Sequence, residues 1–216
     1  SRGNNSLGGK DFDTLLQRHV INDFYNKYGI NLHESCEKRV LQNIKENVEE
    51  AKKQLSIQNS ANIYVPYVSF KDNMPLSIDI DISRKEFESL IMDLVLSTQD
   101  TVEEALKAGN LEAEDIDSVI LVGGSSRVPL VKEILNMKFS GRVKDDINPD
   151  LAVAIGACIQ GEIKSSNSEI SLIVTDKCSH NLGIAVRKNI DGEVRSDIFS
   201  KIIEKDCSVP CSKRKV

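Results

Sequence analysis

The sequence predicts a mixed α/β fold with α+β character, and three observations carry this prediction. Apolar residues recur at helical spacing in several long segments, which indicates amphipathic helices. Two stretches between them alternate apolar and polar residues, the pattern of half-buried strands. A wholly apolar run, Val119–Val122, stands directly before Gly123-Gly124 and a further helical pattern. Such a run is typical of a strand buried on both faces.

The first half of the chain predicts two helices followed by a hairpin. Helical spacing runs over residues 11–28, with Gly29 as the stop, and again over residues 34–55, where charged residues fill the outer face. Residues 61–68 and 76–82 alternate, so we expect Ile63, Val65 and Tyr67 to share one face of the first strand. The turn at Lys71-Asp72-Asn73 joins the two strands.

Later helices carry recognisable start and stop signals. Ser83 and Glu86 have the spacing of a capping box, and the helix they open continues to about Ala108, before Gly109-Asn110. Pro129 suits the first turn of the next helix. Asn148-Pro149-Asp150 predicts the start of an Ala-rich helix that reaches about Ile163.

A change of composition at residues 164–168 predicts a domain boundary, because this stretch is short, polar and serine-rich. An apolar segment, Leu172–Val174, follows it. Strand patterns then occupy residues 182–186 and 198–203, with a turn signal at residues 189–192 between them.

Charge and composition exclude several classes of protein. The formal net charge is −5, with acidic and basic residues intermixed, which argues against a nucleic-acid binder. No apolar stretch is long enough to span a bilayer, and residues 1–10 lack a signal-peptide region, so we expect a cytoplasmic protein without membrane contact. Five scattered cysteines favour free thiols, and Cys207 with Cys211 would need two further ligands to hold zinc, so no metal site is predicted.

The Gly123–Arg127 segment is the most informative local feature. Glycines at a helix N-terminus allow a ligand to lie against the backbone, which favours a nucleotide. The segment matches neither of the common phosphate-loop patterns, and two glycines after a strand also occur in purely structural turns. Both interpretations remain open from these residues alone.

Four stretches in this order resemble the 70-kilodalton heat-shock (DnaK-like) chaperone family. They are Leu7-Gly8-Gly9-Lys10-Asp11-Phe12-Asp13, Glu49-Glu50-Ala51-Lys52-Lys53-Gln54-Leu55-Ser56, Val122-Gly123-Gly124-Ser125-Ser126-Arg127-Val128-Pro129, and Ile147-Asn148-Pro149-Asp150 with the Ala-rich segment after it. Each motif is weak alone, but four in order over about three-quarters of the chain are specific.

The resemblance implies part of an actin-like ATPase domain that binds ATP or ADP. It divides the chain into lobe II at residues 1–164 (subdomain IIB and part of IIA), an interdomain linker at 165–176, and the start of a peptide-binding β-sandwich at 177–216. It also implies that adenosine lies between two groups of residues, Glu49, Lys52, Lys53 and Ser56 on one side and Gly123, Gly124, Ser125, Ser126 and Arg127 on the other, with Asp150 supporting the loop. Helical spacing agrees independently, because the first group falls on one helix face. A solvated charged face is the alternative for such a group.

One departure from the family pattern, and the place of the family's phosphate loops, affect the activity that we expect. The family usually has arginine where this chain has Lys53, and an ammonium group cannot stack on adenine as a planar guanidinium does. The phosphate loops and the aspartates that organise Mg²⁺ precede these motifs in the family. We therefore expect the parent protein to be an ATPase and this chain alone to be inactive.

The leading functional hypothesis is a segment of an ATP-dependent chaperone that couples nucleotide binding to the capture of unfolded polypeptides. The alternative is a non-catalytic module in which residues 11–82 dock a nucleotide-exchange factor or co-chaperone. A sugar kinase of the same superfamily is a weaker third reading, because residues 170–176 resemble a chaperone linker. Incomplete strand pairing at Val119–Val122 and in the sandwich also predicts self-association.

Overall fold

The structure is a computed structural model that describes residues 2–144, 148, 151–165, 176–178, 180–190 and 193–214. The chain forms two compact units, one of residues 4–155 and one of residues 1–3 with 156–216. Helices and strands both make up large parts of the described residues, which confirms the mixed fold class. No helix among them is long and apolar enough to cross a membrane.

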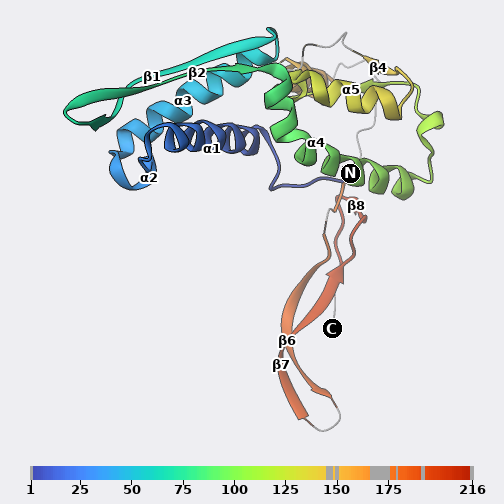
Figure 1. The fold of residues 1–216 in the computed structure, drawn as a ribbon. Helices are drawn as coiled ribbons and strands as arrows, with labels where there is room; N and C mark the ends of the chain where they lie inside the picture. The colour runs from blue at the N-terminus through green and yellow to red at the C-terminus, as the bar shows by residue number, and fades with distance from the viewer. Residues whose placement is uncertain are drawn as a thin grey trace. The chain divides into compact units, whose positions relative to one another are not determined.

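The larger unit is built on a two-stranded hairpin with helices against one face. Strands β1 (Ser60–Lys71) and β2 (Met74–Ser83) pair antiparallel. Helix α3 (Lys38–Leu55) lies along the hairpin, and α1 (Gly9–Tyr28) packs beside α3, as Figure 1 shows. Their contact buries side chains that recur at helical or alternating spacing, among them Leu16, Val20, Ile44, Val48, Leu55, Ile63, Val65 and Ile82. Burial of this apolar surface is the main stabilising contribution to the unit.

The hairpin confirms its predicted turn and corrects one predicted face. Asp72 and Asn73 both have positive φ, the conformation of a type I′ turn, which matches the twist of the strands. Between Val65 and Ser69 the register shifts, and Tyr67 takes a φ of 56°. This bulge turns Tyr67 outward, where it is 67% exposed, and Val68 enters the core instead.

The helix expected over residues 34–55 is in fact two helices. A single turn, α2 (Leu32–Ser35), is capped by the Asn31 side chain, which accepts a hydrogen bond from the His33 backbone N–H. Cys36 and Glu37 are extended, so α3 starts only at Lys38. Periodicity alone missed the break because Leu32 and Val40 both contact the core from either side of it.

Helix α4 (Arg84–Gly109) has the predicted ends. The Ser83 hydroxyl accepts from the Glu86 backbone N–H at 3.2 Å, and the Glu86 carboxylate accepts from the Ser83 backbone N–H at 2.8 Å, completing the capping box. Asn110 takes the left-handed conformation that ends the helix. The first half of α4 buries Phe87, Ile91 and Val95 against the core.

The segment after α4 differs from its prediction. Strand β3 covers only Val119–Ile120 and pairs in parallel with β4 (Val143–Lys144), a partner that the sequence did not reveal. Ile120 is half exposed, so the strand is not buried on both faces within the described residues. The Arg142 side chain donates to the carbonyl of Ala113 in the short helix η1 (Ala113–Asp115), which joins β4 to the loop before β3.

The glycines at 123 and 124 and the proline at 129 precede or begin helical segments. A short 3₁₀ helix, η2 (Gly124–Arg127), leads into α5 (Pro129–Lys138), with proline in its first turn as predicted. Helix α6 (Ala152–Ile163) ends where the sequence indicated. The predicted start of α6 lies mostly outside the described residues, since only Asn148 is described there, and its carbonyl accepts from the backbone N–H of Ala152.

The described residues of the smaller unit form two antiparallel strand pairs. Strands β6 (Leu182–Ile190) and β7 (Glu193–Ile203) form a hairpin, longer than the predicted patterns, and β5 (Asp176–Lys177) pairs with β8 (Ser208–Val209). At Gly183 a Cβ would clash with the Ser200 carbonyl oxygen, so only glycine permits this approach of the two strands. The predicted linker falls outside the described residues except for Ser165 and Asp176.

Candidate functional site

A pocket of about 820 Å³ opens between the C-terminal half of α3 and the loop that contains η2. This volume is within the range of small-molecule sites. Helix α1, the start of α5 and strand β4 complete its wall. Its lining residues are Phe12, Glu49, Lys52, Lys53, Ser56, Ile57, Leu121, Gly124, Ser125, Ser126, Arg127, Val128, Pro129, Lys132 and Lys144.

Eight of the ten residues predicted from the sequence line this one pocket. Glu49, Lys52 and Lys53 line it from α3 and Ser56 from the position just after this helix. Gly124, Ser125, Ser126 and Arg127 line it from η2. Gly123 directly precedes this second group without lining the pocket. Asp150 lies outside the described residues. Two stretches about seventy positions apart in the chain are therefore brought together across a cavity.

The outer rim of the pocket carries an ion pair on α3. The Lys53 ammonium lies 3.0 Å from the Glu49 carboxylate, one helical turn away, and both side chains are about half exposed. The hydrogen bond from Lys53, and then its charge, lower the pKa of Glu49, and the same bond raises the pKa of Lys53. Such exposed pairs add little to stability. Both groups stay ionised near neutral pH and can turn toward a ligand.

Lys52 is held much more firmly than Lys53. Its ammonium lies 2.7 Å from the Asp13 carboxylate and donates to the Gly9 carbonyl at 3.2 Å. The Lys52 and Asp13 side chains are only 16% and 8% exposed. These contacts join α3 to the first turn of α1 and fix the position of the ammonium at the pocket wall.

Gly9 determines how closely the walls approach. A Cβ built there would lie 2.9 Å from the Ser125 hydroxyl oxygen and 3.3 Å from the Lys52 ammonium. The first distance is too short for a real contact, so the Gly9 backbone lies close to the Ser125 side chain, which would have to shift to admit a larger residue. The C-terminal end of α3 is tied separately, because the Arg84 side chain donates to the Leu55 carbonyl at 2.8 Å.

The η2 loop depends on the backbone conformation of Gly123. Its φ of 84° and ψ of 155° belong to a region that is essentially restricted to glycine. The Gly123 carbonyl accepts from the Ser126 hydroxyl at 2.6 Å and from the Ser126 backbone N–H at 3.1 Å. Gly124 has open space around a hypothetical Cβ. Gly123 thus sets the turn, and Gly124 leaves room above it for a ligand.

The lining is basic and apolar, although the chain as a whole is acidic. Five lining residues are basic, namely Lys52, Lys53, Arg127, Lys132 and Lys144, and only Glu49 is acidic. Five more are apolar, namely Phe12, Ile57, Leu121, Val128 and Pro129. A flat apolar group with an attached anion fits such a lining, because basic side chains raise the local concentration of anions.

Sequence reasoning missed two of the lining cations and the partners of Lys52. Lys132 and Lys144 reach the pocket from α5 and β4, which carry no motif of their own at these positions. Gly9 and Asp13 belong to one of the four motifs of the resemblance, yet no role was assigned to them. The Gly8-Gly9 pair at a helix start was the signal that could have pointed to a close approach.

Comparison with known proteins shows the family of the chain. Residues 1–215 match the family model described as Hsp70 protein. The chain is 36% identical, over all of its 216 residues, to the protein named chaperone protein DnaK of Halobacterium salinarum strain R1, and equally to the one of strain NRC-1. The chain spans about a third of the length of these relatives.

Proposed function

Since this chain belongs to the Hsp70 family, we propose that its larger unit binds the adenosine part of an adenine nucleotide, within an ATP-dependent molecular chaperone. The nucleotide would lie in the pocket between α3 and η2. In the parent protein this binding would be coupled to the capture of unfolded polypeptides, with co-chaperones or an exchange factor as partners. The relatives carry the name chaperone protein DnaK, which supports this class of function.

The observation that carries the proposal is the composition of the pocket wall. Its apolar residues suit a purine ring, and its five basic residues suit the phosphates. Lys52, fixed by Asp13, and the Ser56 hydroxyl can donate to ribose oxygens from α3. Arg127 offers a planar guanidinium that can stack on the base. Gly124 allows this approach because no Cβ occupies the space.

The proposal concerns binding and leaves hydrolysis to the parent protein. Phosphoryl transfer depends on positioned metal ions and on charge neutralisation at the γ-phosphate. The resemblance assigns the phosphate loops and the Mg²⁺-organising aspartates to other parts of the family's sequence. We expect no ATP hydrolysis by this chain alone, measured as phosphate release in a preparation freed of host chaperone and compared with a heat-inactivated sample.

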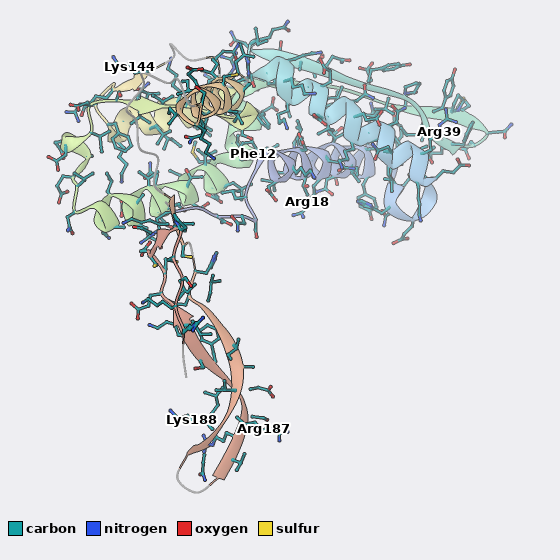
Figure 2. The ribbon with its side chains drawn as sticks, turned by 180° about the vertical axis from the view of Figure 1, so that it is seen from behind. Phe12, Arg18, Arg39, Lys144, Arg187 and Lys188 are labelled. Atoms are coloured by element: carbon teal, nitrogen blue, oxygen red, sulfur yellow. The ribbon has the colours of Figure 1, made fainter. Side chains whose placement is uncertain are left out.

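Calorimetric titration with ADP, with adenosine and with inorganic phosphate tests the site. We expect ADP to bind weakly and Arg127→Ala to reduce its affinity by about tenfold, or about 1.4 kcal/mol. Gly124→Val should act similarly, because its side chain would enter open pocket space without disturbing the fold. Arg39→Ala is the matched control, since Arg39 is exposed in the first turn of the same helix (Figure 2), about 15 Å along it from Glu49.

Three outcomes distinguish an adenosine site from a wrong assignment and from an unspecific anion site. Loss of ADP binding in the two pocket variants, with Arg39→Ala unchanged, supports the assignment. Unchanged binding in both pocket variants means that the site is wrong. Binding of phosphate as tight as that of ADP would reduce the pocket to an unspecific anion site, without recognition of adenosine.

A second candidate function has its own observation on the hairpin. The β1–β2 hairpin exposes three large apolar side chains, with Tyr64 53%, Phe70 64% and Met74 65% exposed. Exposed apolar surface of this kind can take part in protein contacts. This favours the alternative that the region 11–82 docks a nucleotide-exchange factor or co-chaperone.

Met74→Ser tests this second candidate against a matched control. It should weaken the binding of a purified exchange factor, measured by surface plasmon resonance. Met137→Ser should leave that binding unchanged, because Met137 is similarly exposed, at 72%, but lies on α5. Equal effects of the two substitutions would assign the change to general surface polarity and count against the hairpin.

A further inference from the structure

A buried carboxylate lies behind the pocket wall at Lys52. Asp13, near the start of α1, is buried and is not one of the residues that line the pocket. Its carboxylate lies 2.7 Å from the ammonium of Lys52, which does line the pocket. Asp13 therefore contacts the wall from behind, and it can act on a ligand only through Lys52.

The contacts of the Lys52 ammonium leave one direction for a ligand. An ammonium group carries three N–H bonds and has no acceptor. The Asp13 carboxylate lies on one side of it, and the Gly9 carbonyl accepts from it at 3.2 Å on another. Both partners belong to α1. Since the Lys52 side chain is still 16% exposed and lines the pocket, the third N–H bond is the one that can reach a ligand.

Lys53, at the next position, shows how a lysine of this wall behaves without a buried partner. It pairs with Glu49 on the helix surface, and its side chain is 60% exposed. Such an ammonium moves on a flexible stem and acts as a point charge, so it attracts any anion and selects no particular oxygen. Asp13 changes both properties of Lys52, because it restricts the ammonium to one position and offsets its charge at close range.

Ser125 supplies a complementary group from the opposite wall. A Cβ at Gly9 would lie 2.9 Å from the Ser125 hydroxyl oxygen and 3.3 Å from the Lys52 ammonium nitrogen, so both polar atoms approach the same point. A ligand hydroxyl can accept from the ammonium and donate to the Ser125 oxygen. An anion can only accept, and it gains little Coulomb attraction from an ammonium whose charge is already offset.

We propose that Asp13 is a positioning residue that gives the pocket a preference for a sugar hydroxyl over a bare anion, by directing the Lys52 ammonium and offsetting its charge. This inference rests on the proposed binding of adenosine and names the residue that selects the ribose. Loss of the Asp13 charge should weaken the contact with the ribose. Phosphate responds to the net positive charge of the wall, so it should bind at least as well as before.

Calorimetric titration of the full chain and of its Asp13→Asn variant tests this preference. Asparagine has the shape of aspartate and keeps an oxygen acceptor, so the substitution removes the charge with little change in packing. The probes are adenosine, dideoxyadenosine (which lacks both ribose hydroxyls) and inorganic phosphate. Adenosine affinity should fall about tenfold, a typical effect of losing a hydrogen bond to a charged group. Dideoxyadenosine affinity should change by less than about twofold, and phosphate affinity should not fall.

Glu103→Gln is the matched control, because it removes the same charge from beside another lysine. Glu103 lies 2.9 Å from Lys138, and neither of these residues lines the pocket. All three affinities should stay unchanged in this variant. A general effect of net charge would change them in both variants alike.

The Lys52 ammonium gives a second measurement that needs no substitution. Nitrogen–proton correlation spectra of lysine side chains detect ammonium groups that exchange slowly with water, as a group held by a buried carboxylate should. We expect a sharp Lys52 signal in the parent chain that shifts on addition of adenosine and stays in place on addition of dideoxyadenosine. The ammonium of Lys53, which is largely exposed, should give no sharp signal.

Three results would overturn the inference. The first is an equal loss of affinity for adenosine and dideoxyadenosine in Asp13→Asn, which would make Asp13 a purely structural residue. The second is an unchanged affinity for adenosine in that variant. The third is a Lys52 signal that stays in place although adenosine binds. Failure of adenosine to bind to the parent chain is a distinct result, which would refute the proposed function and this inference with it.

Discussion

Replacing Asp13 by alanine should destabilise the larger unit by about 3 kcal/mol, because it leaves the Lys52 ammonium without its partner in a largely buried position. The carboxylate and ammonium are 2.7 Å apart, and neither side chain is more than 16% exposed. After the substitution, the Gly9 carbonyl remains as a hydrogen-bond acceptor for Lys52. Removing one partner of a buried pair typically costs about 3–5 kcal/mol. We expect the lower end of this range because Lys52 lines the pocket, where water can reach its ammonium.

The double variant Asp13→Leu with Lys52→Met distinguishes the pair from simple loss of packing. Both charges are then absent, so the stability should recover to within about 1 kcal/mol of the parent chain. Urea denaturation, followed by helical circular dichroism, measures each free energy of unfolding, and the single variants Asp13→Leu and Lys52→Met complete the double-mutant cycle. Glu103→Ala is the control, since its pair with Lys138 is also short, at 2.9 Å, but Glu103 is half exposed, and little change is expected. A loss below about 1 kcal/mol in Asp13→Ala would refute the reasoning.

Three further predictions concern the loop, the cap and assembly. Gly123→Ala should cost about 1–3 kcal/mol of stability by calorimetry, because its conformation is closed to residues with a Cβ. Hydrogen bonds from Ser83 lower the pKa of Glu86. The cap therefore contributes its full stability at pH values above the ordinary carboxyl pKa. This stability is lost as the pH falls through the lowered pKa of Glu86. Ser83→Ala should therefore cost about 1 kcal/mol at neutral pH, and less in acid melts. Light scattering over a concentration series should reveal self-association, because β3 pairs only with β4 among the described strands; a monodisperse monomer would contradict this.

Local signals in the sequence predicted local structure well. The Ser83–Glu86 box, the Asp72-Asn73 turn and Pro129 each act within a few residues of themselves, so their outcomes depend little on the rest of the chain. The bulge at Tyr67 was missed because alternation continues through it in the sequence, while the register shift depends on the partner strand.

The site residues also divide into those that local motifs indicated and those whose position depends on packing. The α3 and η2 residues were found through motifs that the resemblance supplied, and helical spacing placed four of them on one face. Lys132 and Lys144 come from elements whose positions depend on the packing of α5 and on the pairing of β3 with β4. Nothing in their own neighbourhoods indicates a pocket. Nucleotide binding itself stays a prediction until titration tests it.

The contact at Gly9 has a consequence for how this pocket could change over evolution. A larger residue there would meet the Ser125 hydroxyl and the Lys52 ammonium, which are the mobile ends of two side chains, so both would have to shift. Ser125 and Lys52 line the pocket, whereas Gly9 does not. A substitution at Gly9 would therefore change the pocket wall without replacing any residue that lines it.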